Sequence, residues 1–512
     1  MFLVSGIRLY LCSRPCRICL GSHISETLRM NVEAGYVLIC VDLRLVGFVR
    51  GFYKCVQGEC GSEAEAEGPM SLDHFLSDLE RSTLMRRLIF GHLVYLWTPI
   101  GLLAALAGVL AGGMWVWVGI SVFTLNIILD TVTRNIHTRG AATTKNGEAA
   151  GLGFLHNLVM YLMLPVFVGL LVALAWRVFQ YTAGVPIETQ TFAAFGWSFE
   201  YTNGITGAQL IVATISVALH QGLGIIYGHE LSHTKGPSFL ISRWMMALSG
   251  AAHFCFAHVY NHHLELGRAW LGPEGNKMGD DVDPATAPRG RSIYTHFLVS
   301  HIGQSYFGIL TERKRLKRQG KSFFSLSNRW IRGYLMSVPV VVLFAGAGYM
   351  GGGVEGMLIG LAAMLVVWVI SNFELEALNY MEHYGLIRVK GEPIEYRHSW
   401  DNDGAFTSWA FIEIGRQADH HDRGETHYWE LSSVGGAPQG APNTGFGYYT
   451  EFVLALVPPL WHRIMKQKLA IWDRDFASPE EQKIAREINR KVGYEVDPSA
   501  IQGRTMDVNY AL

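Results

Sequence analysis

The stretch from Gln209 to His233 reads QLIVATISVALHQGLGIIYGHELSH, an apolar run that ends in two histidines four residues apart. A helix needs about 20 mostly apolar residues to cross the hydrocarbon core of a bilayer. Residues at i and i+4 share one face of a helix, and imidazole is the commonest metal ligand in proteins. The stretch therefore predicts a membrane helix with a metal-binding pair, His229 and His233, at its mouth.

The whole chain has the composition of a membrane protein. Of its 512 residues, 50% are hydrophobic and 17% are charged, and the formal net charge of −1 suggests no nucleic-acid partner. The apolar residues are bunched in long runs, namely 88–111, 114–129, 152–176, 209–227, 334–350 and 357–373. We predict an all-α integral membrane protein with about six transmembrane helices.

Four features of the sequence bear on how the chain is threaded through the membrane. Arg243 interrupts a weaker run, 239–257, which we expect to be re-entrant or only partly inserted. Three glycines at 351–353 separate the last two runs and predict a tight hairpin. Arg86-Arg87 and the basic run 313–318 are expected on the cytoplasmic side. Even numbers of crossings separate the histidine clusters described below, so we expect all of them on that side.

Residues 1–69 differ from the rest because they hold six of the seven cysteines. One interpretation is a small metal or redox module built on Cys16-Arg17-Ile18-Cys19 that supplies electrons. The spacing of Cys55 and Cys60 does not match a paired CxxC site, which favours a disordered or mis-assigned extension with a natural start near Met70. We expect a membrane domain over 70–475 and a polar C-terminal tail over 476–512.

Histidines recur in four short clusters that follow or flank apolar runs. The clusters are His229-Glu230-Leu231-Ser232-His233, His258-Val259-Tyr260-Asn261-His262-His263, Asn379-Tyr380-Met381-Glu382-His383 and Gln417-Ala418-Asp419-His420-His421. In the second cluster, His258 and His262 form another i, i+4 pair, and His263 can reach a second metal. The eight imidazoles are His229, His233, His258, His262, His263, His383, His420 and His421. Nitrogen-rich ligation by itself suits Fe, Cu, Zn or Ni.

Polar neighbours of these histidines can hold the imidazoles in one tautomer and orientation. Candidates for this supporting role are Glu230, Glu376, Asn379, Glu382 and Asp419. For each carboxylate, a plain charge at a helix end is an equal alternative. His253 lies five residues before His258 and is expected to be structural, whereas His296 and His301 are expected to be structural or interfacial.

Two other metal-protein classes also place histidines at such spacings. HExxH-like sequences occur in zinc proteases, but zinc normally takes four ligands and cannot use eight histidines. A metal transporter is expected to bury ionisable residues along a path near mid-membrane. Here the clusters fall at the ends of the apolar runs, which favours a catalytic site.

The four clusters resemble the signatures of the membrane di-iron alkane 1-monooxygenases. Relatives of that family include the xylene and cymene monooxygenase hydroxylase subunits and, further off, the fatty-acid desaturases. The segment NYMEHYGLIR at 379–388 is the most specific, because it separates hydroxylases from desaturases. Asp283-Pro284-Ala285 and His398-Ser399-Trp400 also sit where the family carries similar strings. The resemblance covers about three quarters of the chain, roughly 88–472.

The sequence departs from the family pattern in two places. The family usually has a histidine three residues before its last histidine pair, where this chain has Gln417. The resemblance therefore implies eight imidazole ligands, with the amide oxygen of Gln417 as a ninth candidate. The second family motif tends to carry glutamate and glycine, where this chain has Ala257 and Asn261.

The resemblance implies a non-haem centre of two iron ions that hydroxylates a terminal methyl group of an alkane or alkyl chain with O2. No catalytic residue is expected beyond the metal centre. The implied partners are a rubredoxin or ferredoxin-type electron donor with its reductase, membrane lipid and a hydrophobic substrate. The implied location is a bacterial inner membrane, with the site facing the cytoplasm. A desaturase, or a sterol, carotenoid or alkyl-aromatic hydroxylase of the same superfamily, stays open as an alternative, and a histidine-rich metal transporter is the non-enzyme alternative.

Overall fold

The computed structural model describes residues 91–133, 152–194, 196–269, 282–437 and 439–506. The chain divides into two units, Met1–Leu79 and Glu80–Leu512, and every described residue belongs to the second. The cysteines of residues 1–69, the predicted start near Met70 and the Arg86-Arg87 pair therefore lie outside the described residues.

Five helices in the described part of the chain are long and apolar enough to cross a membrane. They are Gly91–Ala111, Gly113–Val132, Gly153–Thr182, Gly207–Ser232 and Arg329–His383. The first four coincide with the first four apolar runs of the sequence, and the fifth contains both remaining runs. The predicted fold class, an all-α integral membrane protein, is confirmed in that the described residues are mostly helical and include these long apolar helices.

The fifth of these helices, α12 (Arg329–His383), is folded back on itself. Its backbone leaves helical geometry at Gly352 and Gly353, and Gly353 has a φ of 61°, which glycine adopts without strain. A Cβ added to Gly348 would come within 2.0 Å of the carbonyl oxygen of Gly356, so the two arms pack backbone against backbone. The predicted hairpin is therefore confirmed, and α12 supplies the fifth and sixth apolar segments.

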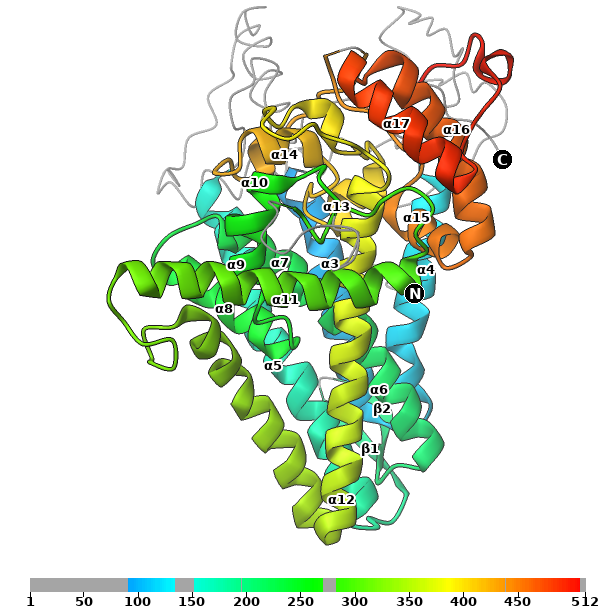
Figure 1. Ribbon diagram of the computed structural model, residues 1–512. Helices are drawn as coiled ribbons and strands as arrows, with labels where there is room; N and C mark the ends of the chain where they lie inside the picture. The colour runs from blue at the N-terminus through cyan, green and yellow to red at the C-terminus, as the bar shows by residue number, and fades with distance from the viewer. Residues whose placement is uncertain (1–90, 134–151, 195, 270–281, 438, 507–512) are drawn as a thin grey trace, which may run out of the picture. The chain divides into compact units, whose positions relative to one another are not determined.

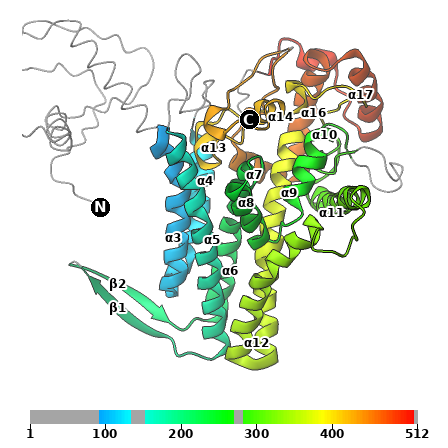
Figure 2. The same ribbon diagram turned by 90° about the vertical axis from the view of Figure 1, so that its left-hand side faces the viewer.

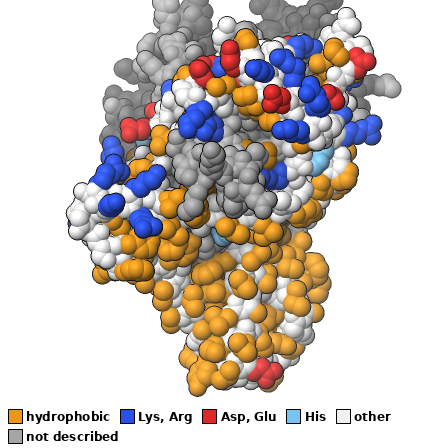
Figure 3. Space-filling view, in the orientation of Figure 1, with side chains coloured by type: hydrophobic (Ala, Val, Ile, Leu, Met, Phe, Trp, Pro, Cys, Tyr) orange, Lys and Arg blue, Asp and Glu red, His pale blue; other side chains and the backbone are white. Residues whose placement is uncertain are grey.

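The membrane-length helices form a stem, defined here as α3 (Trp97–Ala111), α4 (Val118–Val132), α5 (Gly153–Thr182), α6 (Gly207–Gln221) and α12. These helices run side by side in two perpendicular views (Figures 1 and 2). On the face shown in Figure 3, hydrophobic side chains cover most of the stem, whereas most charged side chains gather beyond one of its ends. Residues such as Leu103, Val172 and Leu358 are about half exposed on the outside of the stem, as expected for side chains that face lipid.

Helices outside the stem complete the described unit. They are α7 (Leu223–Ser232), α8 (Pro237–Leu248), α9 (Phe254–Ala257), α10 (His263–Glu265), α11 (Ile293–Arg318), α13 (Ala405–Ala410), α14 (Gln417–Asp422), α15 (Tyr448–Ala455), α16 (Pro458–Asp475) and α17 (Pro479–Val492). Helix α11 lies across the stem, and α13 to α17 gather at one end of it (Figure 1). The weak run 239–257 is divided between α8 and α9, neither of which has membrane length, in agreement with the expectation that it does not cross.

A two-stranded antiparallel hairpin follows α5 and has no counterpart in the predicted elements. Strand β1 (Glu188–Ala194) pairs with β2 (Trp197–Asn203), with Glu188 opposite Asn203 (Figure 2). The buried guanidinium of Arg177 holds this region, because it donates to the carbonyl oxygens of Thr202, Val109 and Leu110. Arg177 thus links α5 both to the end of α3 and to strand β2.

The segment after α16 turns back and packs on the rest of the unit. Ser478 caps α17 in a capping box with Glu481, whose side chain is fully buried. The Glu481 carboxylate contacts His398 Nε2 at 2.8 Å and Arg397 Nε at 3.0 Å. A buried carboxylate with two cationic or hydrogen-bonding partners keeps α17 in place against the loop before α13.

Candidate metal centre

The first histidine pair lies where α7 ends. His229 is buried in the last turn of α7 and His233 is its C-cap, with ring centroids 5.3 Å apart. The sequence predicted that these two imidazoles share one helix face, and their proximity agrees with that expectation. Helix α7 continues directly from α6, so the pair sits at the C-terminal end of a membrane-length helix.

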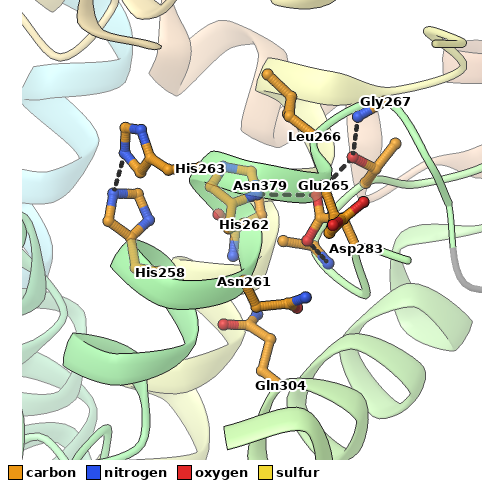
Figure 4. A network of polar contacts seen from close by, with 12 residues as sticks. His258, Asn261, His262, His263, Glu265, Leu266, Gly267, Asp283, Gln304 and Asn379 are labelled. Carbon is orange, nitrogen blue, oxygen red and sulfur yellow. Dashed lines mark hydrogen bonds and ion pairs between the residues drawn. The ribbon is translucent and has the colours of Figure 1, made fainter. Parts of the chain in front are cut away.

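The second cluster adopts a conformation that the sequence did not predict. Residues His258–His262 form a π-helical turn between α9 and α10. A π-helix has i to i+5 hydrogen bonding, so its turn is one residue longer than an α-helical turn. As a result His263, rather than His262, stands against His258, with their Nε2 atoms 2.9 Å apart (Figure 4). The expected pairing of His258 with His262 is therefore wrong, although both rings belong to the centre.

The eight predicted histidines come together in two adjoining groups. One, the five-histidine group, contains His229, His233, His258, His263 and His420, and the other, the three-histidine group, contains His262, His383 and His421. Within each group the candidate ligand atoms all lie within 4.8 Å of one another. The groups meet where the rings of His263 and His421 are 4.4 Å apart, centroid to centroid. Four segments that are distant in the sequence thus supply one compact cluster.

The contacts inside the five-histidine group fit a metal ion better than hydrogen bonding alone. His229 Nε2 lies 2.7 Å and His233 Nε2 lies 3.2 Å from the same atom, His258 Nε2, which also faces His263 Nε2. A neutral imidazole carries one N–H, so a single nitrogen cannot satisfy three others. A cation among these nitrogens would accept all of their lone pairs.

The electrostatic environment keeps these imidazoles neutral. Burial lowers the pKa of His258, His263, His420 and His421 well below the usual value, and neighbouring imidazoles lower it further. Burial also lowers the pKa of His233 to about 4. Both ring nitrogens of His421 and Nε2 of His420 are buried without a hydrogen-bond partner. Neutral imidazoles with free lone pairs are the form in which histidine binds metals.

An apolar cavity lies against the five-histidine group. His229 and His258 form part of its wall, together with polar side chains from α12 and α14. Its apolar wall residues include Leu223, Ile226, Phe254, Leu378, Phe411 and Phe452, and its polar ones include Glu374, Asn379, Glu382 and Gln417. The cavity thus places apolar side chains directly beside the histidines.

Comparisons with known proteins show what this arrangement is similar to. The fatty acid desaturase family model matches residues 205–452, which contain all eight histidines. The xylene/toluene monooxygenase hydroxylase component XylM of Pseudomonas putida is 28% identical over 421 residues, which is 81% of this chain and 99% of the relative. Alkane 1-monooxygenase 1 of Pseudomonas aeruginosa is 29% identical over 379 residues, covering 72% of this chain and 86% of the relative. The central part of the chain thus resembles the fatty acid desaturase family, and most of its length is similar to membrane hydroxylases.

These matches agree with the predicted resemblance and give the site a chemical class. They support a membrane di-iron hydroxylase of the desaturase superfamily, and hence an oxidoreductase. An alkane 1-monooxygenase of Ectopseudomonas oleovorans is also similar, with 27% identity over 308 residues, or 58% of this chain and 69% of the relative. The two histidine groups are consistent with the two-metal site of the family.

The polar residues predicted to support the ligands have definite partners in the structure. Glu230 accepts a hydrogen bond from the backbone N–H of Tyr428 at 2.9 Å, and Asp419 pairs with Arg423. Glu382 accepts from the Tyr448 hydroxyl at 3.0 Å and also from the Gln417 side chain. The Gln417 amide is thus buried between the Glu382 carboxylate and the cavity.

Asp283, which directly contacts a predicted ligand, is not among the supporting residues predicted from the sequence. Asp283 Oδ2 lies 2.8 Å from His262 Nδ1 (Figure 4). The same oxygen accepts from the Thr286 hydroxyl, and the other carboxylate oxygen accepts from the Ala285 N–H. The sequence contains a signal for this role, because Asp283-Pro284-Ala285 resembles a string of the family. Residue spacing alone, however, does not relate Asp283 to any of the histidines.

Proposed function

We propose that this chain is an O2-dependent monooxygenase that hydroxylates a terminal methyl group of an alkane or alkyl chain. The observation that carries the proposal is that His229 and His258, of the five-histidine group, form part of the wall of an apolar cavity. A methyl group has no polar handle, so an enzyme that attacks it must place an apolar molecule next to the oxidising centre. The named activities of the relatives, on alkanes and on xylene or toluene, support a methyl-bearing hydrophobic substrate.

The donor sets fit two iron ions. The five-histidine group would hold one ion and the three-histidine group the other, with Gln417 as a further candidate ligand. When bound, the two irons supply the activation of O2 and the oxidising power that an unactivated C–H bond requires.

The protein's own groups orient the ligands and keep the site dry. Asp283 would accept the Nδ1 proton of His262 and so leave its Nε2 lone pair for the metal, as carboxylates often do for metal-binding histidines. The apolar residues of the cavity wall exclude water and hold the substrate by burial of its surface. Phe254 lies in the same wall and its ring centroid is 4.9 Å from that of His258, so a substrate that contacts it would be next to the centre.

Electrons would come from a separate protein. One similar protein is named as the hydroxylase component of its enzyme, so a further component must carry electrons. We propose a rubredoxin or ferredoxin-type donor with its reductase. Such carriers are acidic, and the end of α11 exposes Arg313, Lys314, Lys317 and Arg318. This basic end also supports an inner-membrane orientation with the site facing the cytoplasm.

The proposal is tested by measuring iron content and turnover on the same purified protein. Detergent-purified chain, supplied with a reduced electron carrier and O2, is assayed on octane, hexadecane and p-xylene. We expect two iron ions in the histidine groups and a primary alcohol from at least one substrate, with neither product nor full iron content in a His262→Ala variant. A double bond in the product would instead establish the desaturase alternative. Unchanged turnover of correctly folded His262→Ala would refute the assignment of this ligand.

A further inference from the structure

A third group of metal-binding side chains lies outside the two histidine groups. His253 directly precedes α9, His301 lies in α11 and Glu376 lies in α12. One candidate ligand atom from each lies within 4.8 Å of the other two. The sequence assigned the two histidines to structural roles and Glu376 to support of the main centre. None of the three belongs to the five-histidine or the three-histidine group.

The carboxylate of Glu376 is held rigidly. Its Oε2 accepts hydrogen bonds from the Ser300 hydroxyl at 2.5 Å and from Asn379 Nδ2 at 3.0 Å, while Oε1 accepts from Gln304 Nε2 at 2.8 Å. Gln304 and Asn379 both appear in the close view of the polar network (Figure 4). Hydrogen bonds of this kind orient ligating carboxylates and make up much of the design of a metal site.

The two imidazoles, in contrast, have buried ring nitrogens without hydrogen-bond partners. Both ring nitrogens of His253 and the Nδ1 of His301 are buried without a hydrogen bond. The rings meet edge to face with centroids 4.7 Å apart, and burial lowers the pKa of each, so both are neutral. A buried polar atom without a partner is unfavourable, which calls for an explanation in this structure. His296 also has unpartnered ring nitrogens, so it is the convergence with Glu376 that distinguishes His253 and His301.

We propose that His253, His301 and Glu376 form a third metal site that binds one divalent transition-metal ion, with Zn²⁺ the best match. Two imidazoles and one carboxylate are a donor set that Zn²⁺ and Fe²⁺ both accept. Because the three residues come from separate segments, the ion cross-links α11 and the start of α9 to α12. Its role is to hold α11 against the stem, and it takes no part in the oxidation.

The test is a count of bound metal on the full purified chain. After metal removal and equilibration with Zn²⁺ alone, followed by desalting, wild type should retain one more ion per chain than His301→Ala. His301 is only partly buried, so this variant removes a ligand without opening a fully buried site. His462→Ala is the matched control, since His462 is also a partly buried histidine but lies on α16, outside all three groups; it should bind as many ions as wild type.

A second variant distinguishes the loss of a ligand from misfolding of the protein. Glu376→Gln keeps the size of the side chain and should lose the same single ion as His301→Ala. Added Zn²⁺ should raise the Tm of wild type by more than it raises that of either variant, because an ion bound only to the folded state stabilises it. Equal Zn²⁺ content in wild type and both variants would overturn the proposal. The count needs no turnover, so its failure and a failure of the hydroxylase proposal are separate results.

Discussion

The five-histidine group and the three-histidine group differ in how the chain builds them. In the five-histidine group, α7 and the π-turn after α9 supply four of the imidazoles, and only His420 comes from far away in the sequence. In the three-histidine group each imidazole comes from a different segment, and His262 has a carboxylate, Asp283, behind it. The three-histidine group has fewer ligands, and a carboxylate holds one of them. Loss of one residue should therefore lower metal affinity and turnover more in this group than in the five-histidine group.

The largest expected effect is on His262. His262→Ala removes one of only three imidazoles from its group and leaves Asp283 buried without its partner. Because changing even a residue behind a ligand costs about 10–100-fold in metal affinity or activity, we expect loss of the ligand to lower turnover by more than about 100-fold. Iron content and product formation on the same preparation measure the effect. An elution profile from gel filtration in detergent that matches wild type is the control for folding.

The second largest effect is expected at Asp283, the carboxylate that contacts His262 of the three-histidine group. Asp283→Asn removes the negative charge that holds His262 in one tautomer, and we expect about a 10–100-fold loss of iron affinity or turnover. Thr286→Val is the control, because it removes a hydrogen bond to the same Asp283 oxygen but leaves the His262 contact intact. Equal losses in the two variants would show that Asp283 acts on the local loop rather than on His262.

A smaller loss is expected from the five-histidine group. His233→Ala leaves four imidazoles there, and four ligands are enough to hold a metal ion. We expect turnover to fall by about 10-fold at most, the lower end of the range for residues behind ligands. A loss as large as that of His262→Ala would break the comparison between the two groups.

The smallest effect should be a gain. Gln417 lies four residues before His421 at the start of α14, so Gln417→His offers a fourth imidazole toward the three-histidine group. We expect slower iron release on incubation with a chelator, with turnover within a few-fold of wild type. Gln417→Leu, which cannot ligate or hydrogen-bond to Glu382, is the contrast. Faster iron release from Gln417→His than from wild type would contradict this placement.

The stem and the centre also differ in how far the sequence could predict them. The apolar runs gave the membrane segments and the α12 hairpin, because crossing a bilayer imposes length and composition on each segment separately. The eight histidines were found because they occur in short clusters. Their division into two groups was not predicted. The expected spacing assumes an α-helix, whereas the π-turn places His263 rather than His262 against His258.

The sequence mainly failed to predict contacts between residues that lie far apart along the chain. Asp283 lies 21 residues after His262, and His253, His301 and Glu376 are spread over three segments. No local spacing relates such residues, so only the packing of α9, α11 and α12 brings them together. The β1–β2 hairpin was missed for a different reason, since a short pair of strands between two long apolar runs has little apolar patterning of its own.

The central claim is that two metal ions sit in neighbouring and unequal histidine groups. Mössbauer spectroscopy of ⁵⁷Fe-loaded protein tests it most directly, in the His301→Ala background so that the third group does not contribute. We predict two iron environments of equal population, of which His262→Ala removes one. A single iron environment, or two that survive His262→Ala unchanged, would contradict the account.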